Sequence, residues 1–190
     1  MSNKHYTVTE EINGRKIVAQ FSGISTGIKA TDKCNVEGTN NVSMVKLAEY
    51  LFEYVIVEPK LSIKDFGADK VGKIEKKTIG GVEYEAKFDG LMTALKAVDD
   101  NYNDDNGGTS TEKFAEFLFK NIIVKPEKLE IDDFETTEDF KKVVAFAREV
   151  MQGGEVWKEF QQIIAFANKV MNGQFRDRKD GCTTEKASKG

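Results

Sequence analysis

The chain has few of the residues on which most catalytic and metal-binding sites depend. Its 190 residues include one histidine, His5, and two cysteines, Cys34 and Cys182. His5 stands close to the N-terminus with no evident carboxylate or thiol partner, so we expect a plain surface residue rather than a catalyst or ligand. The cysteines lie far apart, in a polar loop and a polar tail. This pattern excludes a disulfide framework and is typical of free thiols in a reducing cytoplasm.

The chain also lacks a basic excess and a long apolar run. Its formal net charge is −4, whereas nucleic-acid binders usually carry a basic surface that neutralises phosphates. No stretch approaches the roughly 18 apolar residues of a membrane span, and no apolar run follows the first residues as in a signal peptide. We therefore expect a cytoplasmic protein that contacts neither nucleic acid nor membrane.

Sequence motifs of common enzyme classes are missing as well. There is no glycine-rich phosphate loop, no nucleophile elbow and no Cys-x-x-Cys pair. A nucleophilic cysteine needs a base, and none can be nominated for Cys34. We therefore predict a protein that is not an enzyme, with no catalytic residue and no cofactor.

One polar segment has the spacing of a calcium-binding loop. Positions 1, 3, 5 and 12 of such a loop would be Asn101, Asn103, Asp105 and Glu112. Position 6, where the sharp turn requires glycine, is Asn106, and position 1 is neutral. The favoured interpretation is a solvated, flexible loop without a metal, and a calcium site is the alternative.

What the sequence does contain is an internal repeat. At an offset of 67 positions, residues 12–59 align with 79–126 without a gap, and 18 of the 48 positions are identical. The chain's two prolines, Pro59 and Pro126, occupy equivalent positions. After one inserted residue the match resumes, with LSIKDF at 61–66 against LEIDDF at 129–134. This predicts two duplicated copies of one unit.

A second repeat has an offset of 20 positions. Residues 139–153 align with 159–173, with seven of fifteen positions identical. The different offsets predict a nested arrangement, in which a helix at 137–152 closes the second unit and a helix at 157–172 returns to close the first. The reverse pairing stays open, although a short connection favours the nested one. The predicted domains are 1–66 plus 155–175, then 67–154, then a flexible tail at 176–190.

Within each unit the pattern predicts a mainly helical α+β fold, with a β-hairpin followed by helices. Alternating apolar residues around Asn13-Gly14 and Gly80-Gly81 predict hairpins. The expected strands are 6–12, 16–21, 71–78 and 82–88; the expected helices are 24–31, 91–99, one from Ser43 to about 55 and one from Ser110 to about 122. Residues 109–112 read as a capping box with Thr109 as the cap, Thr136 can cap the closing helix, and Gly153 and Gly173 fit helix stops.

Two aromatic residues of the closing helices lie off the main apolar stripe. Phe146 and Phe166 are about half a turn from the stripe that includes Val143, Val144 and Ala147. A helix that is apolar on more than one face is either central to its own fold or covered by a partner. Core packing is the default interpretation, and partner binding at these two residues is the alternative.

Several segments resemble the tail assembly chaperones of long-tailed phages and prophages, especially those of Gram-positive hosts. They are 48–66 (AEYLFEYVIVEPKLSIKDF), its copy at 115–134 and the closing stretch 140–153 (FKKVVAFAREVMQG). The turn at 12–16 (INGRK) is similar to the hairpin with which those proteins open, and 157–175 matches a family terminus better than 137–154 does. The resemblance covers nearly the whole chain once per unit, whereas the family pattern has a single unit.

The resemblance implies a transient, non-enzymatic function in phage tail assembly. Such chaperones coat the helical tape measure protein, keep it soluble, help recruit tail tube subunits and leave before the virion is complete. We therefore expect the tape measure protein and the tail tube protein as partners, the host cytoplasm as the location and no place in the mature virion. Self-association is left open. The alternatives are a phage-encoded inhibitor that binds a host defence protein, and a calcium-responsive binding module.

Overall fold

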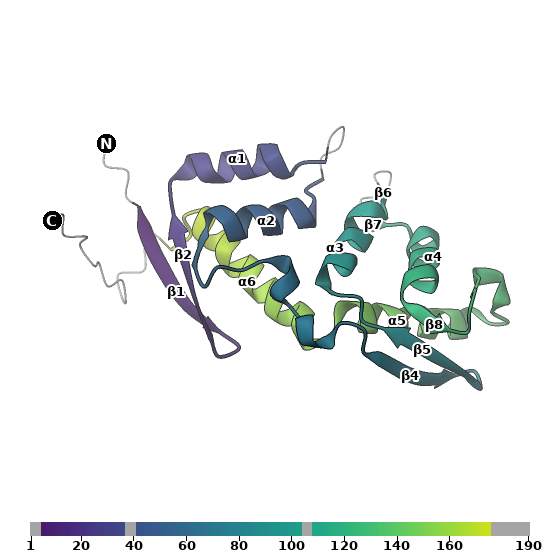
Figure 1. Cartoon of the computed structure of the whole chain (residues 1–190). Helices are drawn as coiled ribbons and strands as arrows, with labels where there is room; N and C mark the ends of the chain where they lie inside the picture. The colour runs from purple at the N-terminus through teal and green to yellow at the C-terminus, as the bar shows by residue number, and fades with distance from the viewer. Residues whose placement is uncertain (1–4, 37–40, 104–107, 176–190) are drawn as a thin grey trace. The chain divides into compact units, whose positions relative to one another are not determined.

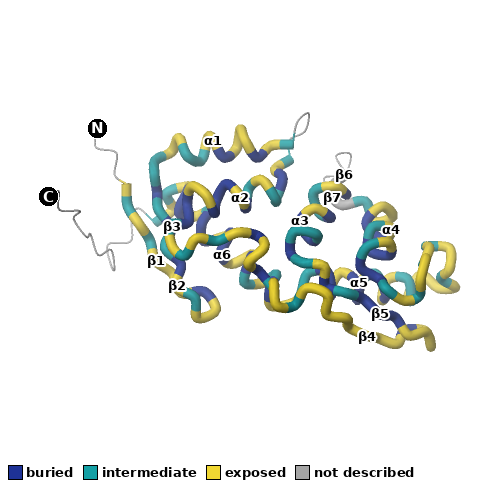
Figure 2. Tube along the Cα trace, viewed as in Figure 1, coloured by how far each residue is buried: buried dark blue, intermediate teal, exposed yellow. Residues whose placement is uncertain are grey.

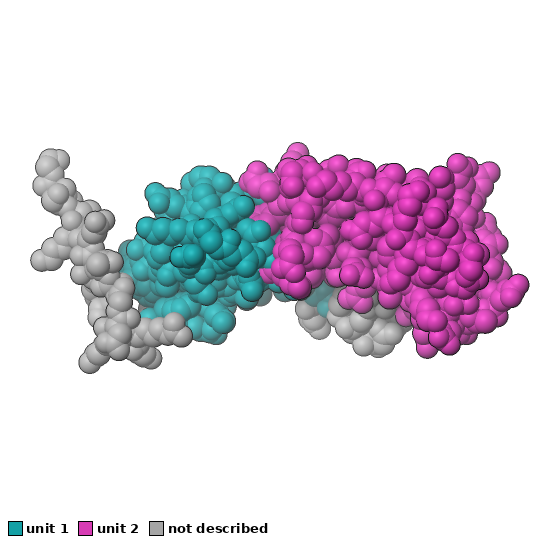
Figure 3. Space-filling view, turned by 90° about the horizontal axis from the view of Figure 1, so that it is seen from below, with its two compact units in different colours: residues 1–62, 159–190 teal, residues 63–158 magenta. Residues whose placement is uncertain are grey.

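The computed structural model describes residues 5–36, 41–103 and 108–175. The chain forms two compact units (Figure 3): residues 1–62 together with 159–190 form the first, and residues 63–158 form the second. Both units contain helices and an antiparallel sheet (Figure 1), so the predicted α+β fold class is confirmed. The tail predicted at 176–190 lies outside the described residues.

The first unit is built on a three-stranded sheet with the order β1-β2-β3. Its elements are β1 (Tyr6–Ile12), β2 (Arg15–Phe21), α1 (Ile24–Cys34), α2 (Met44–Tyr54) and β3 (Ile56–Glu58), and the greater part of α6 (Glu155–Met171) belongs to it. The helix α1 packs on α2. Phe160 of α6 contributes a fully buried ring, which lies edge-on to Phe52 of α2 with 6.2 Å between centroids.

The second unit has a sheet of the same kind, with the order β4-β5-β8. Its elements are the 3-10 turns η1 (Ile63–Asp65) and η2 (Ala68–Lys70), β4 (Ile74–Ile79), β5 (Val82–Lys87), α3 (Leu91–Asp100), the short pair β6 (Tyr102–Asn103) and β7 (Gly108–Thr109), α4 (Thr111–Asn121), β8 (Ile123–Lys125), η3 (Ile131–Asp133) and α5 (Thr137–Gln152). The helix α5 packs against the β4–β5 hairpin and against both α3 and α4.

Each hairpin gains a third strand from the segment that follows its second helix. Ile56 pairs with Ala19 in one sheet, and Ile123 pairs with Ala86 in the other. A two-stranded hairpin is marginal on its own, and the added strand supplies a further ladder and a buried isoleucine. The residues before Pro59 and Pro126 are therefore extended, as the sequence predicts, and the preceding helices end at Tyr54 and Asn121.

The helix termini agree with the sequence except at one cap. Thr136 Oγ1 accepts from Asp139 N at 3.1 Å, as expected for the start of α5. At the start of α4 the predicted cap, Thr109, is wrong: Ser110 Oγ accepts from Lys113 N at 3.5 Å. Either hydroxyl can take an orphan helix N–H, but the helix begins one residue later than the capping box requires.

Two other predicted boundaries are also wrong. The strand expected from residue 71 begins at Ile74, because Gly72 has a φ of +82° and interrupts the extended backbone. The helix expected to end near residue 31 continues to Cys34, which is buried at its end rather than set in a polar loop. A free cysteine behaves as a small apolar side chain, so Cys34 is buried although its neighbours in the sequence are polar.

An aromatic cluster joins several elements of the second unit. The Phe134 ring lies 5.6 Å from Phe119 and 5.5 Å from Phe140 between centroids, and it stacks on Tyr84 at 6.5 Å. These rings join β5, α4, α5 and the chain after η3. The burial pattern (Figure 2) places the dark, buried positions of each unit on the faces where its helices meet its sheet.

Candidate protein-binding groove

The structure describes the side chains of two of the four residues of the predicted calcium loop. Asn101 is buried at the end of α3, where its Nδ2 donates to Ala97 O at 2.8 Å. Glu112 is exposed in the first turn of α4. The side chain of Asn103 and the whole of Asp105 lie outside what is described. Among the described residues, no group of three or more His, Cys, Asp or Glu side chains is arranged to hold a metal ion.

The histidine and the described cysteine lie in contrasting environments. His5 is exposed immediately before β1. Cys34 is a free, buried thiol whose pKa is raised chiefly by burial, against a lowering by Lys46 and Lys33. A raised pKa disfavours the nucleophilic thiolate, so this environment suits packing rather than covalent chemistry. Cys182 lies outside the described residues.

Phe146 and Phe166 are core residues, so the alternative that they form a partner surface is wrong. Phe146 is buried, with Lys77 Nζ of β4 lying 5.7 Å from its ring centroid. Phe166 is buried in the first unit and lies edge-on to Phe175 at 6.0 Å between centroids. For α5 the reason is that the helix is covered on more than one side, by the hairpin and by two helices.

A groove with a volume of about 710 Å³ runs beside α5 in the second unit. The α5 residues that line it include positions 140, 144, 148 and 152. Residues four apart share one face of a helix, so the groove follows α5 for about three turns, or roughly 18 Å. Its apolar lining residues include Val98 of α3, Phe114 of α4, Phe140, Val144 and Ala145 of α5, and Trp157 at the start of α6.

Charged side chains of both signs also line this groove. Arg148 lies over the ring of Phe114, 6.0 Å from its centroid, and so joins α5 to α4 across the groove. Glu149 and Glu155 add negative charge, and Lys158 pairs with Glu155 at 2.6 Å. The hydrogen bond from Lys158 lowers the pKa of Glu155. A floor of apolar groups between charges of both signs is suited to an amphipathic helix.

A second apolar feature lies on α1 in the first unit. Ile24 and Ile28 are 67% and 58% exposed, the highest values among the large hydrophobic side chains of the described residues. They stand one helical turn apart on the same face, and we call this pair the α1 ridge. Their repeat counterparts on α3, Leu91 and Leu95, are fully buried, and α3 packs against α5 and η1.

No sequence pattern predicts the groove, because its lining residues come from four helices, α3, α4, α5 and α6. The exposure of the α1 ridge also cannot be predicted from residue type. The aligned pairs are isoleucine and leucine, with nearly equal hydrophobicity, yet one pair is exposed and the other is buried. Burial here depends on which element packs over the helix.

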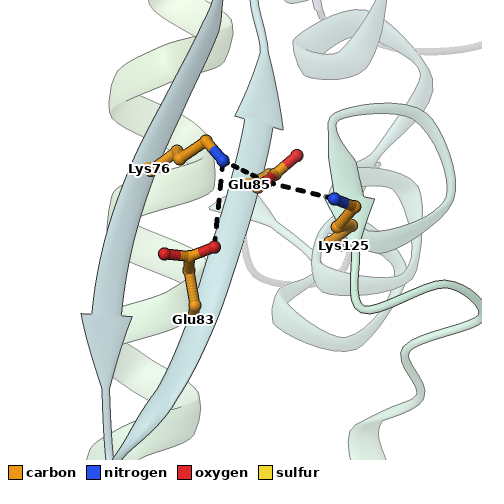
Figure 4. Close-up of polar contacts among 4 residues, drawn as sticks. All are labelled: Lys76, Glu83, Glu85 and Lys125. Carbon is orange, nitrogen blue, oxygen red and sulfur yellow. Dashed lines mark hydrogen bonds and ion pairs between the residues drawn. The ribbon is translucent and has the colours of Figure 1, made fainter.

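A cluster of charged residues crosses the sheet of the second unit (Figure 4). Glu85 on the central strand β5 accepts from Lys76 of β4 at 2.6 Å and from Lys125 of β8 at 3.3 Å. The Glu85 side chain is only 6% exposed, whereas both lysine side chains are more than half exposed. One carboxylate thus joins all three strands. We interpret this cluster as a contact that stabilises the sheet and not as a catalytic site.

Comparison of the chain with protein-family models, with curated proteins and with solved structures finds no match. Among the described residues, no helix combines the length and the apolar character needed to cross a bilayer.

Proposed function

We propose that the chain is a non-enzymatic tail assembly chaperone of a phage or prophage. It acts in the host cytoplasm, binds the tape measure protein, helps to recruit tail tube subunits and is absent from the mature virion. The proposal is supported by the sequence segments that resemble this family. Those segments contain β3 and the η1 that follows it, β8 and the η3 that follows it, and the helices α5 and α6.

The observation that carries the proposal is the groove beside α5. This helix includes residues 140–152 of the stretch 140–153 that resembles the family. Tape measure helices expose apolar faces until the tail tube encloses them, and an apolar groove about three turns long can cover such a face. Phe114, Val144 and Trp157 supply its apolar surface, and the surrounding charges keep the unoccupied groove compatible with water.

We also infer that the two units arose by nested duplication. The sheets have the same strand order, and Ser43 and Ser110 cap equivalent helices. The helix α5 packs on β4 and β5, whereas Glu159 of α6 pairs with Arg15 of β2 at 3.5 Å. These contacts support an insertion of the second unit into the first.

Co-expression with the tape measure protein from the same genome tests the chaperone proposal. The tape measure protein is expected in the soluble fraction only when this chain is present. Ala145→Glu places a carboxylate in the groove at an exposed helix position, so it should abolish the effect without unfolding α5. Val82→Glu, at an exposed valine of β5 outside the groove, is the matched control and should behave as wild type.

Two results would count against the proposal. If the tape measure protein is equally insoluble with and without the chain, the chaperone function is wrong. If wild type and Ala145→Glu solubilise it equally well, the function survives but the groove is not its site.

A further inference from the structure

We propose that the two units differ in function and that only the second binds a client, so that one chain holds one client helix. The inference rests on the proposed function, because it concerns the number of client sites in the chain. It depends on a separate comparison, however, between the residues that line the groove beside α5 and their counterparts in the first unit. The two internal repeats identify these counterparts, at offsets of 67 and 20 positions.

The first difference is that the closing helix of the first unit is already covered at the matching positions. Phe140 and Val144 of α5 line the groove and are half-buried. Their counterparts on α6 are Phe160, which is fully buried, and Ile164, which is 7% exposed. Burial of apolar surface drives association in proportion to the area removed from water. Phe160 and Ile164 therefore have little surface left to offer a partner helix.

The second difference lies in the opposite wall of the groove. Val98 of α3 lines this wall, and its counterpart on α1 is Thr31. Phe114 of α4 also lines it, and its counterpart on α2 is the smaller Leu47. The Thr31 hydroxyl donates to Gly27 O at 3.2 Å within its own helix. A client helix on the first unit would thus meet a polar group and lose an aromatic ring, which is among the largest apolar surfaces a side chain can offer.

The third difference is Trp157, the one tryptophan of the chain. It lines the groove together with other residues of the segment 154–158, which joins α5 to the first turn of α6. The repeat that relates the two closing helices ends at residues 153 and 173, so this segment has no counterpart in the first unit. Buried tryptophans often carry much of the binding energy of an interface, and only the second unit supplies one.

Together these differences assign separate roles to the two copies. The second unit keeps an apolar groove, whereas the first has its closing helix covered by its own side chains. A long client with several apolar helical segments would therefore recruit one chain for each segment, not one chain for every two.

The fluorescence of Trp157 tests the inference, because the chain has no other tryptophan and this one lines the groove. The probes are synthetic segments of the tape measure protein that lack tryptophan and are predicted to be amphipathic helices. Each is about 20 residues long, since shorter isolated helices are marginal in water. The emission of Trp157 should shift on binding and saturate at one peptide per chain, and isothermal titration calorimetry should give the same ratio.

The internal repeat also provides a matched pair of variants. Ala145 lines the groove, and its counterpart Ala165 lies on α6; both are exposed. Ala145→Glu should abolish both the peptide binding and the fluorescence change, because it places a carboxylate in an apolar contact. Ala165→Glu makes the same change in the first unit and should leave the affinity and the binding ratio as in wild type.

The possible failures can be told apart. Two peptides per chain would overturn the inference, as would a loss of binding by a folded Ala165→Glu protein, and both results would leave the chaperone function intact. Peptide binding that does not alter the emission of Trp157 would place the client outside the groove and would also overturn it. Failure of every segment to bind would instead count against the chaperone function, and the inference would fall with it.

Discussion

Lys76 Nζ lies 2.6 Å from Glu85 Oε1, and this contact joins two neighbouring strands of the second sheet. Lys125 reaches the same carboxylate oxygen from the third strand at 3.3 Å. The hydrogen bond from Lys76 holds the pKa of Glu85 below its ordinary value; burial opposes this, and Lys125 adds to it. The carboxylate therefore stabilises the folded state in its charged form.

Replacement of Glu85 should destabilise the second unit in a pH-dependent way. Glu85→Gln removes the charge and is expected to lower the melting temperature at neutral pH. Because the folded pKa lies below the unfolded one, the stabilising contribution is complete above the ordinary glutamate pKa of about 4.3 and is lost as the pH falls through the folded pKa. The melting temperatures of variant and wild type should therefore converge in acid.

Glu83 provides the matched control for this measurement. It lies on the same strand and reaches the same lysine at 3.8 Å, but its side chain is 61% exposed. Exposed ion pairs contribute little, so Glu83→Gln should melt like wild type throughout. A Glu85→Gln protein as stable as wild type at neutral pH would show that the three-strand contact is unimportant.

The two serine caps should differ in their contribution to stability. Ser43 Oγ accepts from Lys46 N at 3.2 Å, whereas the equivalent bond from Lys113 N to Ser110 Oγ is 3.5 Å long. Replacing such a cap by alanine costs about 1 kcal/mol. Ser43→Ala is expected to reach this value and Ser110→Ala to fall below it, as measured by urea unfolding.

Glycine variants separate the cap from other effects at these positions. Gly is itself tolerated at an N-cap and costs only a few tenths of a kcal/mol relative to serine. Ser43→Gly should therefore lie between wild type and Ser43→Ala. If the alanine and glycine variants lose equal stability, the loss comes from the packing of the buried Ser43 side chain and not from helix capping.

Local features were predictable from the sequence because their causes are local. Strand 6–12 follows from alternation up to an Asn-Gly turn, and helix 137–152 follows from a threonine cap and a glycine stop; both agree with the structure. Ser110 and Thr109 are adjacent hydroxyl residues with similar capping ability, so the sequence could not choose between them. The cap is decided by where the chain leaves β7.

Surface properties could not be predicted in the same way. Ile28 and Leu95 are aligned and equally apolar, and only the elements packed over them make one exposed and the other buried. Phe146 lies off the main stripe of its helix, yet it is buried because α5 is covered on more than one side. The groove likewise depends on the spacing of four helices, α3 to α6, which no local pattern encodes.

Truncation after Gly153 should unfold the first unit rather than trim the chain. It removes α6, whose Phe160, Ile163, Ala167 and Val170 are fully buried. Without Phe160, Phe52 of α2 would lose a ring contact and be exposed to water. Amide hydrogen exchange in β1, β2 and α2 is expected to lose its protection, whereas a chain truncated after Phe175 should keep it.

The same experiment bears on the nested arrangement. Loss of protection confined to the first unit would agree with a second unit closed by α5. If residues 6–58 remain protected in the shorter chain, α6 does not complete the first unit and the nesting is wrong. The internal repeat would stand in either case, because it is a property of the sequence.

Two adjacent glycines after α5 should respond very differently to alanine. Gly153 and Gly154 both have positive φ, at 67° and 56°, so each alanine variant incurs a backbone penalty of about 1–2 kcal/mol. At Gly154 an added Cβ would meet no atom within 4 Å, whereas at Gly153 it would lie 2.7 Å from Phe88 Cε2. Phe88 is buried and cannot simply swing into water.

The Gly153→Ala variant should therefore lose a further 1–3 kcal/mol or so from overpacking, beyond the loss at Gly154. Urea unfolding of the two variants measures this difference directly. In a Phe88→Ala background the ring is gone, so the additional penalty at Gly153 should disappear while the backbone penalty at both positions remains. Equal losses at the two glycines in the wild-type background would show that the Phe88 ring can move aside. In that case the close approach between Phe88 and the end of α5 does not constrain the fold.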